Sequence, residues 1–323
     1  MSKLIYVTRR IPDNGIQIMK DKGYTVDIGE KIEKPSKEEI IKAISKKEYD
    51  GMISFLTDPI DKDIFDACKT LKIVAQFAVG FDNINLADAK EHSIVTTNTP
   101  KVLSLTVAEH TVALMLALTT RTVEGDSFMR SGKYTGWSPY LLNGTDITGK
   151  TIGILGAGAI GSEVASMLHF GFKCPIIYHD INENKTFEEK FQAQFVDKET
   201  LLKTSDIVSI HVSLSPSTKH LINKESLHLM KKDAYLVNTS RGPVIDEAAL
   251  VEALKEGTIK GAGLDVYEFE PKLSEGLAEL TNVILTPHIA SASDNARKEM
   301  ARVAAENIVS FFETGKAINE IIK

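Results

Sequence analysis

Residues 151–170 read TIGILGAGAIGSEVASMLHF, and this stretch decides the fold. The apolar run TIGIL predicts a strand, and SEVASMLHF has the apolar spacing of a helix. Between them, Gly156, Gly158 and Gly161 form the pattern GxGxxG. In this setting the glycines permit a tight turn, a close approach of backbone to a pyrophosphate and a close helix–strand contact. The stretch therefore predicts a dinucleotide site in an α/β domain.

The next strand supports this interpretation. Ala159 and Ile160 stand at the start of the helix, where unpaired N–H groups can bind phosphate. The strand PIIYHD then ends in Asp180, nineteen residues after Gly161. A carboxylate there would bind the adenosine ribose hydroxyls and repel the 2′-phosphate of NADP, so we expect NAD as the cofactor, with NADP the less favoured alternative. The structural alternative is that Asp180 only caps the following loop.

Strand and helix patterns alternate on both sides of this motif. Such alternation implies parallel strands with helices on both faces, and right-handed crossovers then give doubly wound sheets. We therefore expect an α/β protein with two doubly wound parallel-sheet domains. The predicted strands are residues 3–7, 25–28, 51–56, 71–79 and 94–97 in the first block, and 151–155, 175–179, 207–212, 234–238, 261–266 and 283–285 in the second.

The two blocks meet at a plausible hinge. Pro100 biases Thr99 towards extended backbone, and a long apolar helix is predicted over 102–121. Residues 130–149 show no period and could form an arm that packs on a partner. A final helix is expected over 294–313, with Asp294 as its N-cap, and should return to the first block. The predicted domains are 1–98 plus 294–323, which would bind substrate, and 99–293, which would bind the dinucleotide.

Composition limits the other functional classes. Hydrophobic residues make up 43% of the 323 residues and charged residues 25%, as in globular proteins, and the net charge of −6 does not favour nucleic acid or an anionic membrane as a partner. No apolar run is long enough for a membrane span, and the first residues lack an apolar signal core, so we expect a cytoplasmic protein. Cys68 and Cys174 are expected to be buried fillers, and no metal site is expected.

Three later motifs carry side chains suited to chemistry. They are NTSRG at 238–242, GLDVYEFEP at 263–271 and TPHIAS at 286–291, and each follows a predicted strand. Because the carboxyl ends of parallel strands meet at one edge of a sheet, these motifs should converge there.

Reduction of a 2-oxo acid needs three groups that these motifs supply. Arg241 can bind the substrate carboxylate through two parallel N–H bonds. His288 can donate a proton to the carbonyl oxygen, because imidazole titrates near neutral pH. Glu270 can favour the protonated imidazole, although Glu268 nearby is an alternative partner. The structural alternatives are a surface ion pair, a solvated glutamate and a loop histidine.

Together the motifs resemble those of the D-isomer-specific 2-hydroxyacid dehydrogenases, over essentially the whole chain. The resemblance implies a Rossmann dinucleotide-binding domain, a flavodoxin-like substrate domain, and catalysis by Arg241, Glu270 and His288. It further implies cofactor contacts at Val212, Ser213, Thr239 and Asp265, and substrate contacts at Leu56, Val79, Gly80, Arg241 and His288, with Leu56, Phe77 and Phe81 around the substrate side chain.

The segments SFLTDPID and AVGFDNIN look most like the glyoxylate/hydroxypyruvate reductase branch. This implies an NADH-dependent reduction of a small 2-oxo acid to the D-2-hydroxy acid, and a homodimer formed through helix 102–121 and an arm containing Trp137. D-lactate or another D-2-hydroxyacid activity is the near alternative, and formate or phosphonate oxidation is a weaker one. A non-catalytic NAD-sensing corepressor is the alternative from another class. Ser213 and Lys101 depart from the family pattern, which usually has Pro and Gly there.

Overall fold

The computed structural model describes residues 2–321, and the chain forms two compact units, each built on its own parallel sheet. The terminal unit contains the residues up to Leu103 together with those from Ala292 onwards, and the central unit is Ser104–Ser291. All strand pairs in both sheets are parallel, and helices lie between successive strands except between β11 and β12. The predicted class, an α/β fold with two parallel-sheet domains, is confirmed.

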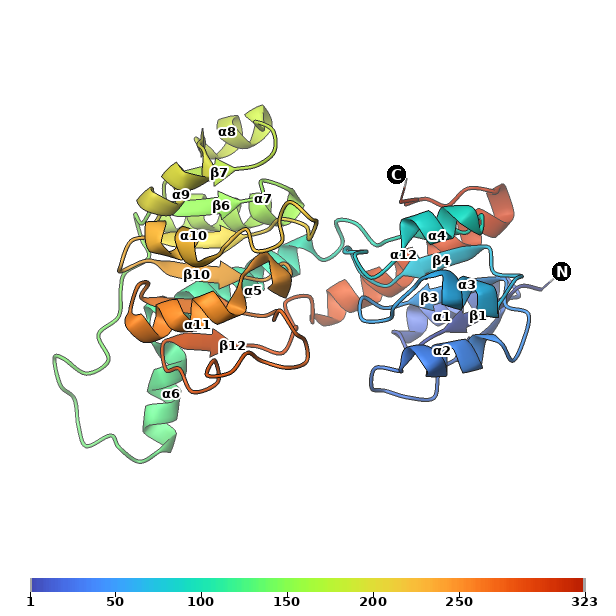
Figure 1. Ribbon diagram of the computed structural model, residues 1–323, viewed down its shortest axis with the longest axis horizontal. Coiled ribbons are helices and arrows are strands. Elements are labelled where there is room, and N and C mark those ends of the chain that lie inside the picture. Colours follow the sequence, from blue (N-terminus) through green and yellow to red (C-terminus); the bar gives the residue numbers. More distant parts are fainter. Residues whose placement is uncertain (1, 322–323) are drawn as a thin grey trace. The chain divides into compact units, whose positions relative to one another are not determined.

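The terminal unit has a five-stranded sheet in the order β2-β1-β3-β4-β5. Helix α12 packs along α1 and on β4, while α2 contacts α3, and α3 contacts α4, on the other side of the sheet (Figure 1). The elements of this unit are β1 (Leu4–Val7), α1 (Asp13–Asp21), β2 (Thr25–Ile28), α2 (Lys37–Ile44), β3 (Gly51–Ser54), α3 (Lys62–Ala67), β4 (Ile73–Gln76), α4 (Leu86–Glu91), β5 (Val95–Thr97) and α12 (Asp294–Thr314).

Helices α2 and α12 of this unit begin directly after capping residues. Ser36 and Glu39 form a reciprocal capping box at the start of α2. At α12 the N-cap is Ser293, whose hydroxyl accepts from the N–H of Ala296, so the prediction of Asp294 as N-cap is wrong by one residue. Asp294 instead occupies the first helical turn, where its negative charge interacts favourably with the helix dipole.

The central unit has a seven-stranded sheet in the order β12-β11-β10-β9-β6-β7-β8. Helices α5 and α7 pack together on one face, and α9, α10 and α11 lie on the other (Figure 1). The elements are α5 (Ser104–Thr119), α6 (Thr122–Arg130), β6 (Ile152–Leu155), α7 (Ala159–Ser166), a π-helical turn (Met167–Gly171), β7 (Ile176–His179), α8 (Lys185–Phe191), β8 (Gln194–Phe195), α9 (Lys198–Thr204), β9 (Ile207–Ile210), α10 (Lys224–Leu229), β10 (Tyr235–Asn238), a 3-10 turn (Gly242–Val244), α11 (Glu247–Glu256), β11 (Gly261–Leu264) and β12 (Val283–Leu285).

The middle of this sheet is the core of the unit. All residues of β6, β9 and β10 are buried, which explains why these strands are apolar runs rather than alternating ones. The chain reverses the direction of strand addition at β6, because β7 lies on one side of it and β9 on the other. Ligands of doubly wound sheets bind at such a switch point, outside the carboxyl ends of the strands.

Some expected boundaries shift. The strands predicted over 51–56, 71–79, 207–212 and 261–266 end earlier, because their last residues leave the sheet as loops. The short edge strand β8 was not predicted. The helix predicted over 102–121 is α5, and Arg121, with φ of 57°, separates it from α6. Both cysteines are buried, as predicted. Within residues 2–321, no helix has the length and apolar character to cross a bilayer.

Candidate active site

Six loops of the central unit leave the sheet at the same edge, because all seven strands are parallel. The loop after β6 contains the glycine motif, and the loop after β7 begins with Asp180. The remaining loops follow β9, β10, β11 and β12, and carry respectively Val212, Arg241, Asp265 and His288.

The glycine motif forms an open cradle at the start of α7. Gly156 has φ of 99° and its backbone approaches the carbonyl of His211 so closely that a Cβ would lie 2.9 Å from it. At Gly161 a Cβ would lie 2.2 Å from the carbonyl oxygen of Gly156, so helix and loop touch there. A Cβ on Gly158 would meet no protein atom within 4 Å. The open space lies at a helix N-terminus, where a phosphate group would fit.

Asp180 lies beside this cradle. Its Oδ2 accepts a hydrogen bond from the N–H of Ala157 at 2.8 Å, and its Oδ1 accepts one from Ile181 at 2.7 Å. The carboxylate therefore ties the loop after β7 to the glycine loop. These bonds leave acceptor capacity on both oxygens, since a carboxylate has about four lone-pair positions.

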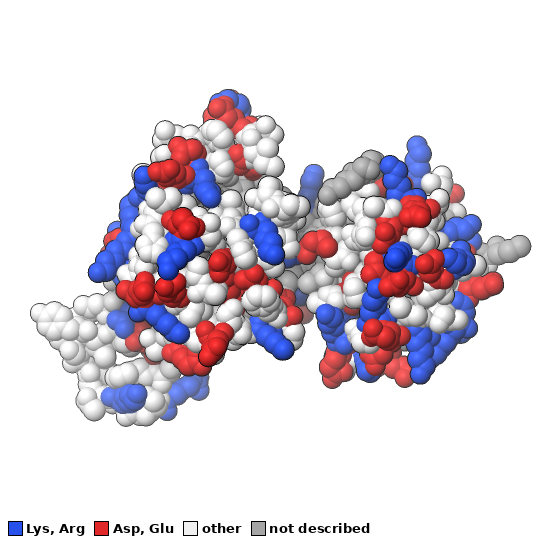
Figure 2. Space-filling view, in the orientation of Figure 1, with Lys and Arg blue, Asp and Glu red and all other residues white. Residues whose placement is uncertain are grey.

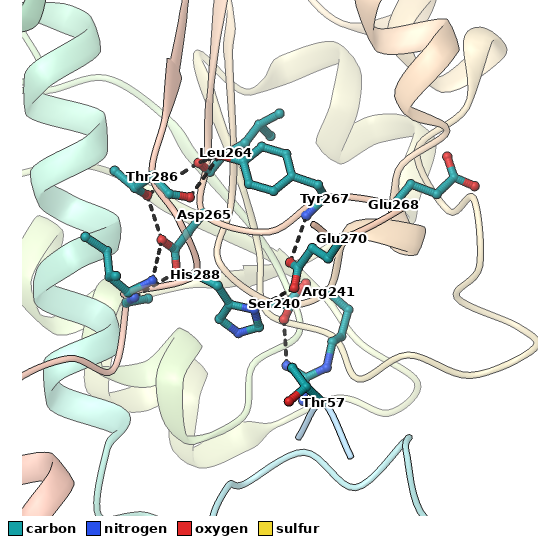
Figure 3. Close-up of polar contacts among 12 residues, drawn as sticks. Thr57, Ser240, Arg241, Leu264, Asp265, Tyr267, Glu268, Glu270, Thr286 and His288 are labelled. Atoms are coloured by element: carbon teal, nitrogen blue, oxygen red, sulfur yellow. Dashed lines mark hydrogen bonds and ion pairs between the residues drawn. The ribbon is translucent and has the colours of Figure 1, made fainter. Parts of the chain in front are cut away.

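Glu270 and His288 form the central pair of the site. Glu270 Oε2 lies 3.0 Å from His288 Nδ1, and Glu270 Oε1 accepts from the N–H of Tyr267 at 3.0 Å. Figure 3 shows the imidazole directed at Glu270, with Glu268 pointing away from both. Because Nδ1 faces a carboxylate, it carries a proton, and the opposite nitrogen, Nε2, is left to act on a ligand.

His288 is held in place by its backbone. Its φ is 54°, an uncommon left-handed conformation for a residue other than glycine. Its N–H donates to the carbonyl of Asp265 at 2.9 Å, and the Asp265 carboxylate accepts from the N–H groups of Ile289 and Ala290, both at 2.8 Å. The residues on both sides of the histidine are thus fixed to the end of β11.

The Asp265 carboxylate accepts several hydrogen bonds. Thr286 Oγ1 donates to it at 2.6 Å, and His110 on α5 lies 3.1 Å from that hydroxyl and 3.5 Å from the carboxylate. Burial by itself raises the pKa of Asp265, but the hydrogen bonds from His110, Thr286, Ile289 and Ala290 together hold the pKa below its usual value. The group is therefore an anion at neutral pH.

Arg241 lies on a turn shaped by Asn238. The Asn238 side chain accepts from the N–H of Ser240 at 2.9 Å and donates to the carbonyl of Arg241 at the same distance. The next residue, Gly242, is so close to Tyr267 that a Cβ would lie 1.9 Å from its carbonyl. The loops that carry Arg241 and Glu270 are therefore in contact (Figure 3).

The remaining predicted cofactor positions lie at the same edge. Thr239 is 8% exposed and its hydroxyl lies 2.8 Å from that of Thr111 on α5. Val212 is half-buried and Ser213 is exposed. Next to them, burial lowers the pKa of His211 to about 3, so this imidazole is neutral.

The predicted substrate positions outside the central unit lie on two loops of the terminal unit. Leu56 follows β3, and Val79 and Gly80 follow β4. The second loop is fixed by Asn98, which donates to the carbonyl of Val79 at 2.8 Å, and by Gln76, whose side-chain amide lies 3.3 Å from the carbonyl of Gly80. Phe77 is 3% exposed and packs on Phe55, so it supports these loops from within.

Two histidines outside the predicted motifs lie near the site. His110 contacts Thr286, and His220 Nε2 lies 2.6 Å from Glu268 Oε1. Neither could be found from the sequence, because each meets a partner from a distant segment of the chain. Among the described residues no cluster of three or more His, Cys, Asp or Glu side chains is suited to hold a metal ion.

Comparison with known proteins defines the class. The family model for the NAD-binding domain of D-isomer-specific 2-hydroxyacid dehydrogenases matches residues 112–290, and the chain belongs to this family. A glyoxylate reductase from Thermococcus litoralis is 43% identical over 315 residues, covering 96% of this chain and 94% of the relative.

Solved structures agree with this family. A protein from Thermus thermophilus superimposes with a TM-score of 0.92 at 38% identity, covering 99% of this chain and all of the other. An NADPH-dependent glyoxylate/hydroxypyruvate reductase from Sinorhizobium meliloti, solved with NADP and malonate, has a TM-score of 0.85 at 28% identity and covers 99% and 97% of the two chains.

Proposed function

We propose that this protein reduces a small 2-oxo acid, glyoxylate or hydroxypyruvate in the first place, to the D-2-hydroxy acid with NADH. The observation that carries the proposal is the 3.0 Å contact between Glu270 and His288, on a loop that touches the loop of Arg241. This contact supports a role for His288 as proton donor and for Arg241 as the cation that binds a carboxylate, at the edge of the sheet where the glycine motif also lies.

Each group has a defined task in this reaction. Arg241 binds and orients the substrate carboxylate. His288 donates the proton on Nε2 to the carbonyl oxygen as negative charge develops there. Glu270 keeps the ring oriented through Nδ1 and stabilises its protonated form. In the reverse direction His288 takes the proton from the hydroxyl.

The dinucleotide would be held by the glycine cradle and Asp180, and it supplies the hydride. The backbone at Gly158, Ala159 and Ile160 would hold the pyrophosphate, and Asp180 would bind the ribose. The remaining contacts would come from Val212, Ser213, Thr239 and Asp265. Their chemistry fits NAD better than NADP, although the Sinorhizobium meliloti relative uses NADPH. Asp180 would repel a 2′-phosphate, and Lys185, the nearest cation along the chain, already pairs with Glu183 and Glu188.

The decisive test is oxidation of NADH and NADPH with glyoxylate, hydroxypyruvate, pyruvate and larger 2-oxo acids. We expect the highest kcat/KM for glyoxylate or hydroxypyruvate, with NADH preferred by about tenfold or more. A preference for pyruvate would indicate D-lactate dehydrogenase activity, and equal use of NADPH would contradict the role of Asp180. Tight NADH binding without turnover of any 2-oxo acid would favour the sensor alternative.

The variant His288→Ala separates turnover from cofactor binding. Because His288 touches substrate and not the dinucleotide cradle, the variant should lose most turnover and keep its NADH dissociation constant. A loss of NADH binding would contradict the assignment.

We further propose that the protein is a homodimer and acts in the cytoplasm. Helix α5 buries most of its residues inside the central unit, whereas α6 has no buried residue and the arm of residues 131–149 is mostly exposed, so these two segments are available for a second copy. Trp137 and Tyr140 on this arm are 83% and 86% exposed, and the arm is largely uncharged (Figure 2, lower left). Beside α6 lies a cavity of about 420 Å³ whose lining includes Leu118, Val123, Val283 and Ile284. The arm and the cavity lie on the same unit, and in a two-fold interface the same surface of each subunit takes part, so both features could contribute to the contact.

A further inference from the structure

We propose that His220 is a positioning residue for the Glu270–His288 pair and acts through Glu268. The inference rests on the proposed function for its link to turnover. The observation behind it is a second imidazole–carboxylate contact, His220 Nε2 to Glu268 Oε1 at 2.6 Å, two residues along the chain from the first.

Glu268 is tied to the start of α11. Its N–H donates to Glu247 Oε2 at 2.7 Å, and its own Oε2 accepts from the N–H of Glu247 at 3.1 Å. The other oxygen of Glu247 accepts from the N–H of Ser274 at 2.7 Å. Glu247 therefore fixes the 266–274 loop at two points, one on each side of Glu270.

This arrangement brings the carboxylates of Glu247 and Glu268 together in a place that is largely shielded from water. Glu247 is 3% exposed, and the side chain of Glu268 is 11% exposed. Neighbouring carboxylates in such a place repel each other unless donors or cations compensate them. The N-terminus of α11 supplies part of the compensation, and the His220 ring supplies the donor for the remaining Glu268 oxygen.

His220 also reaches the loop of Arg241. Its N–H donates to the carbonyl of Pro243 at 2.9 Å, and that of Ile222 donates to the carbonyl of Val244 at 3.1 Å. The segment that carries His220 thus lies along the chain that follows Arg241. Its φ of 51° is uncommon outside glycine, so the surrounding contacts hold His220 in this conformation.

The consequence for the site follows from the short chain between the two glutamates. Glu270 Oε1 accepts from the N–H of Tyr267, so Glu268 lies inside the turn that orients the Glu270 carboxylate. If Glu268 loses its imidazole partner and turns away from Glu247, this turn loosens. Glu270 then meets His288 less often in the productive orientation. The effect should fall on kcat rather than on cofactor binding.

The test uses His220→Leu, which removes the donor, and His220→Gln, which can keep a donor near the position of Nε2. We expect His220→Leu to lower kcat about fivefold or more with glyoxylate or hydroxypyruvate, with the KM for NADH within about twofold, and His220→Gln to restore most of kcat. The matched control is His92→Leu, because His92 forms a similar contact with Asp66 at 3.3 Å in the terminal unit, and it should change neither value.

A second measurement does not depend on turnover. Hydrogen exchange of the amides of Glu268 and Ser274 should be faster in His220→Leu than in wild type, while the melting temperature stays close to that of wild type. Wild-type kcat and unchanged exchange in His220→Leu would overturn the inference and leave the proposed function standing. Absence of turnover in the wild-type protein would instead refute the proposed function, and exchange alone would then decide whether His220 holds the loop.

Discussion

Glu268 and Glu270 have the same side chain and lie two residues apart, yet they face different partners. Glu270 accepts from the ring of His288, and Glu268 accepts from that of His220. The fold of the loop explains the difference. A turn at Tyr267 directs Glu270 towards the loop after β12, and Glu268 stays against the start of α11. The family motif favours Glu270 as the partner, but only the folded loop shows what Glu268 does instead.

The proposed role of Arg241 can be tested by substitution. Arg241→Ala should raise the KM for the 2-oxo acid and lower kcat, with a total loss in kcat/KM of about 100-fold or more, because the variant lacks the guanidinium proposed to bind the substrate carboxylate through two parallel N–H bonds. Arg241→Lys keeps the charge without the two parallel donors and should recover only part of the loss. Steady-state kinetics of wild type and both variants measure kcat and the KM for the 2-oxo acid. An unchanged KM in Arg241→Ala would show that the carboxylate binds elsewhere.

Asp265 gives a prediction about pH. Because its pKa is lowered in the folded protein, its ionisation stabilises the fold above the pKa of an unfolded aspartate, about 3.9, and this contribution disappears as the pH falls through the folded-state pKa. Asp265→Asn should therefore lose about 2–3 kcal/mol at pH 7, since two backbone N–H groups and Thr286 lose a charged acceptor.

Urea denaturation at pH 7, 5 and 3.5 measures the difference between Asp265→Asn and wild type. The difference in the free energy of unfolding should be similar at pH 7 and pH 5, and smaller at pH 3.5. If this difference does not change with pH, the negative charge of Asp265 does not contribute to the free energy of unfolding.

At the scale of single elements, the β6–α7 unit is where local sequence and structure agree most closely. The strand is completely buried, the glycines follow at once, and the helix begins at Ala159. The strands were located well, but their ends were not, because an apolar residue in a loop at the edge of a sheet looks like a continuation of the strand. The arm after α6 has no period, and its sequence could not predict what covers its exposed aromatic rings.

Two alanine substitutions in the glycine motif separate folding from binding. Gly161→Ala places a Cβ 2.2 Å from the Gly156 carbonyl oxygen, so helix α7 must shift, and we expect a loss of about 1–3 kcal/mol in stability. Gly158→Ala meets no protein atom within 4 Å and should keep wild-type stability. It should weaken NADH binding, because the Cβ would enter the space proposed for the pyrophosphate.

Thermal unfolding without cofactor and titration with NADH distinguish the two variants. If Gly158→Ala bound NADH as tightly as wild type does, the cradle would not be the dinucleotide site.

At the scale of the whole molecule, the chain makes two separate sheets, and the last helix belongs with the first strands. Helix α12 packs along α1, although the two lie near opposite ends of the chain, and Asn307 donates to the carbonyl of Asn98 at 3.1 Å. The two most exposed aromatic side chains, Trp137 and Tyr140, both lie on the arm, which is the basis for the proposed dimer.

The dimer leads to a prediction about the arm. Trp137→Ser together with Tyr140→Ser should convert a wild-type dimer into monomer at micromolar concentration, because the two exposed rings are the largest apolar side chains that a second copy could bury. Sedimentation equilibrium measures the mass of both proteins. Exposed Ile32 lies in the terminal unit, so Ile32→Ser is the control that should leave the mass unchanged. A monomeric wild type would refute the proposal.

The sequence alone determined the α/β class, the glycine turn between β6 and α7, and the residue types that suit 2-oxo acid chemistry, because these depend on local periodicity and on motifs a few residues long. Only the tertiary structure decided that Ser293 rather than Asp294 caps α12, that Asp265 fastens the backbone beside His288, and that Glu268 meets His220. Those outcomes depend on which loops meet at the edge of a sheet, and contacts between segments distant in the chain leave no period in the sequence that could predict them.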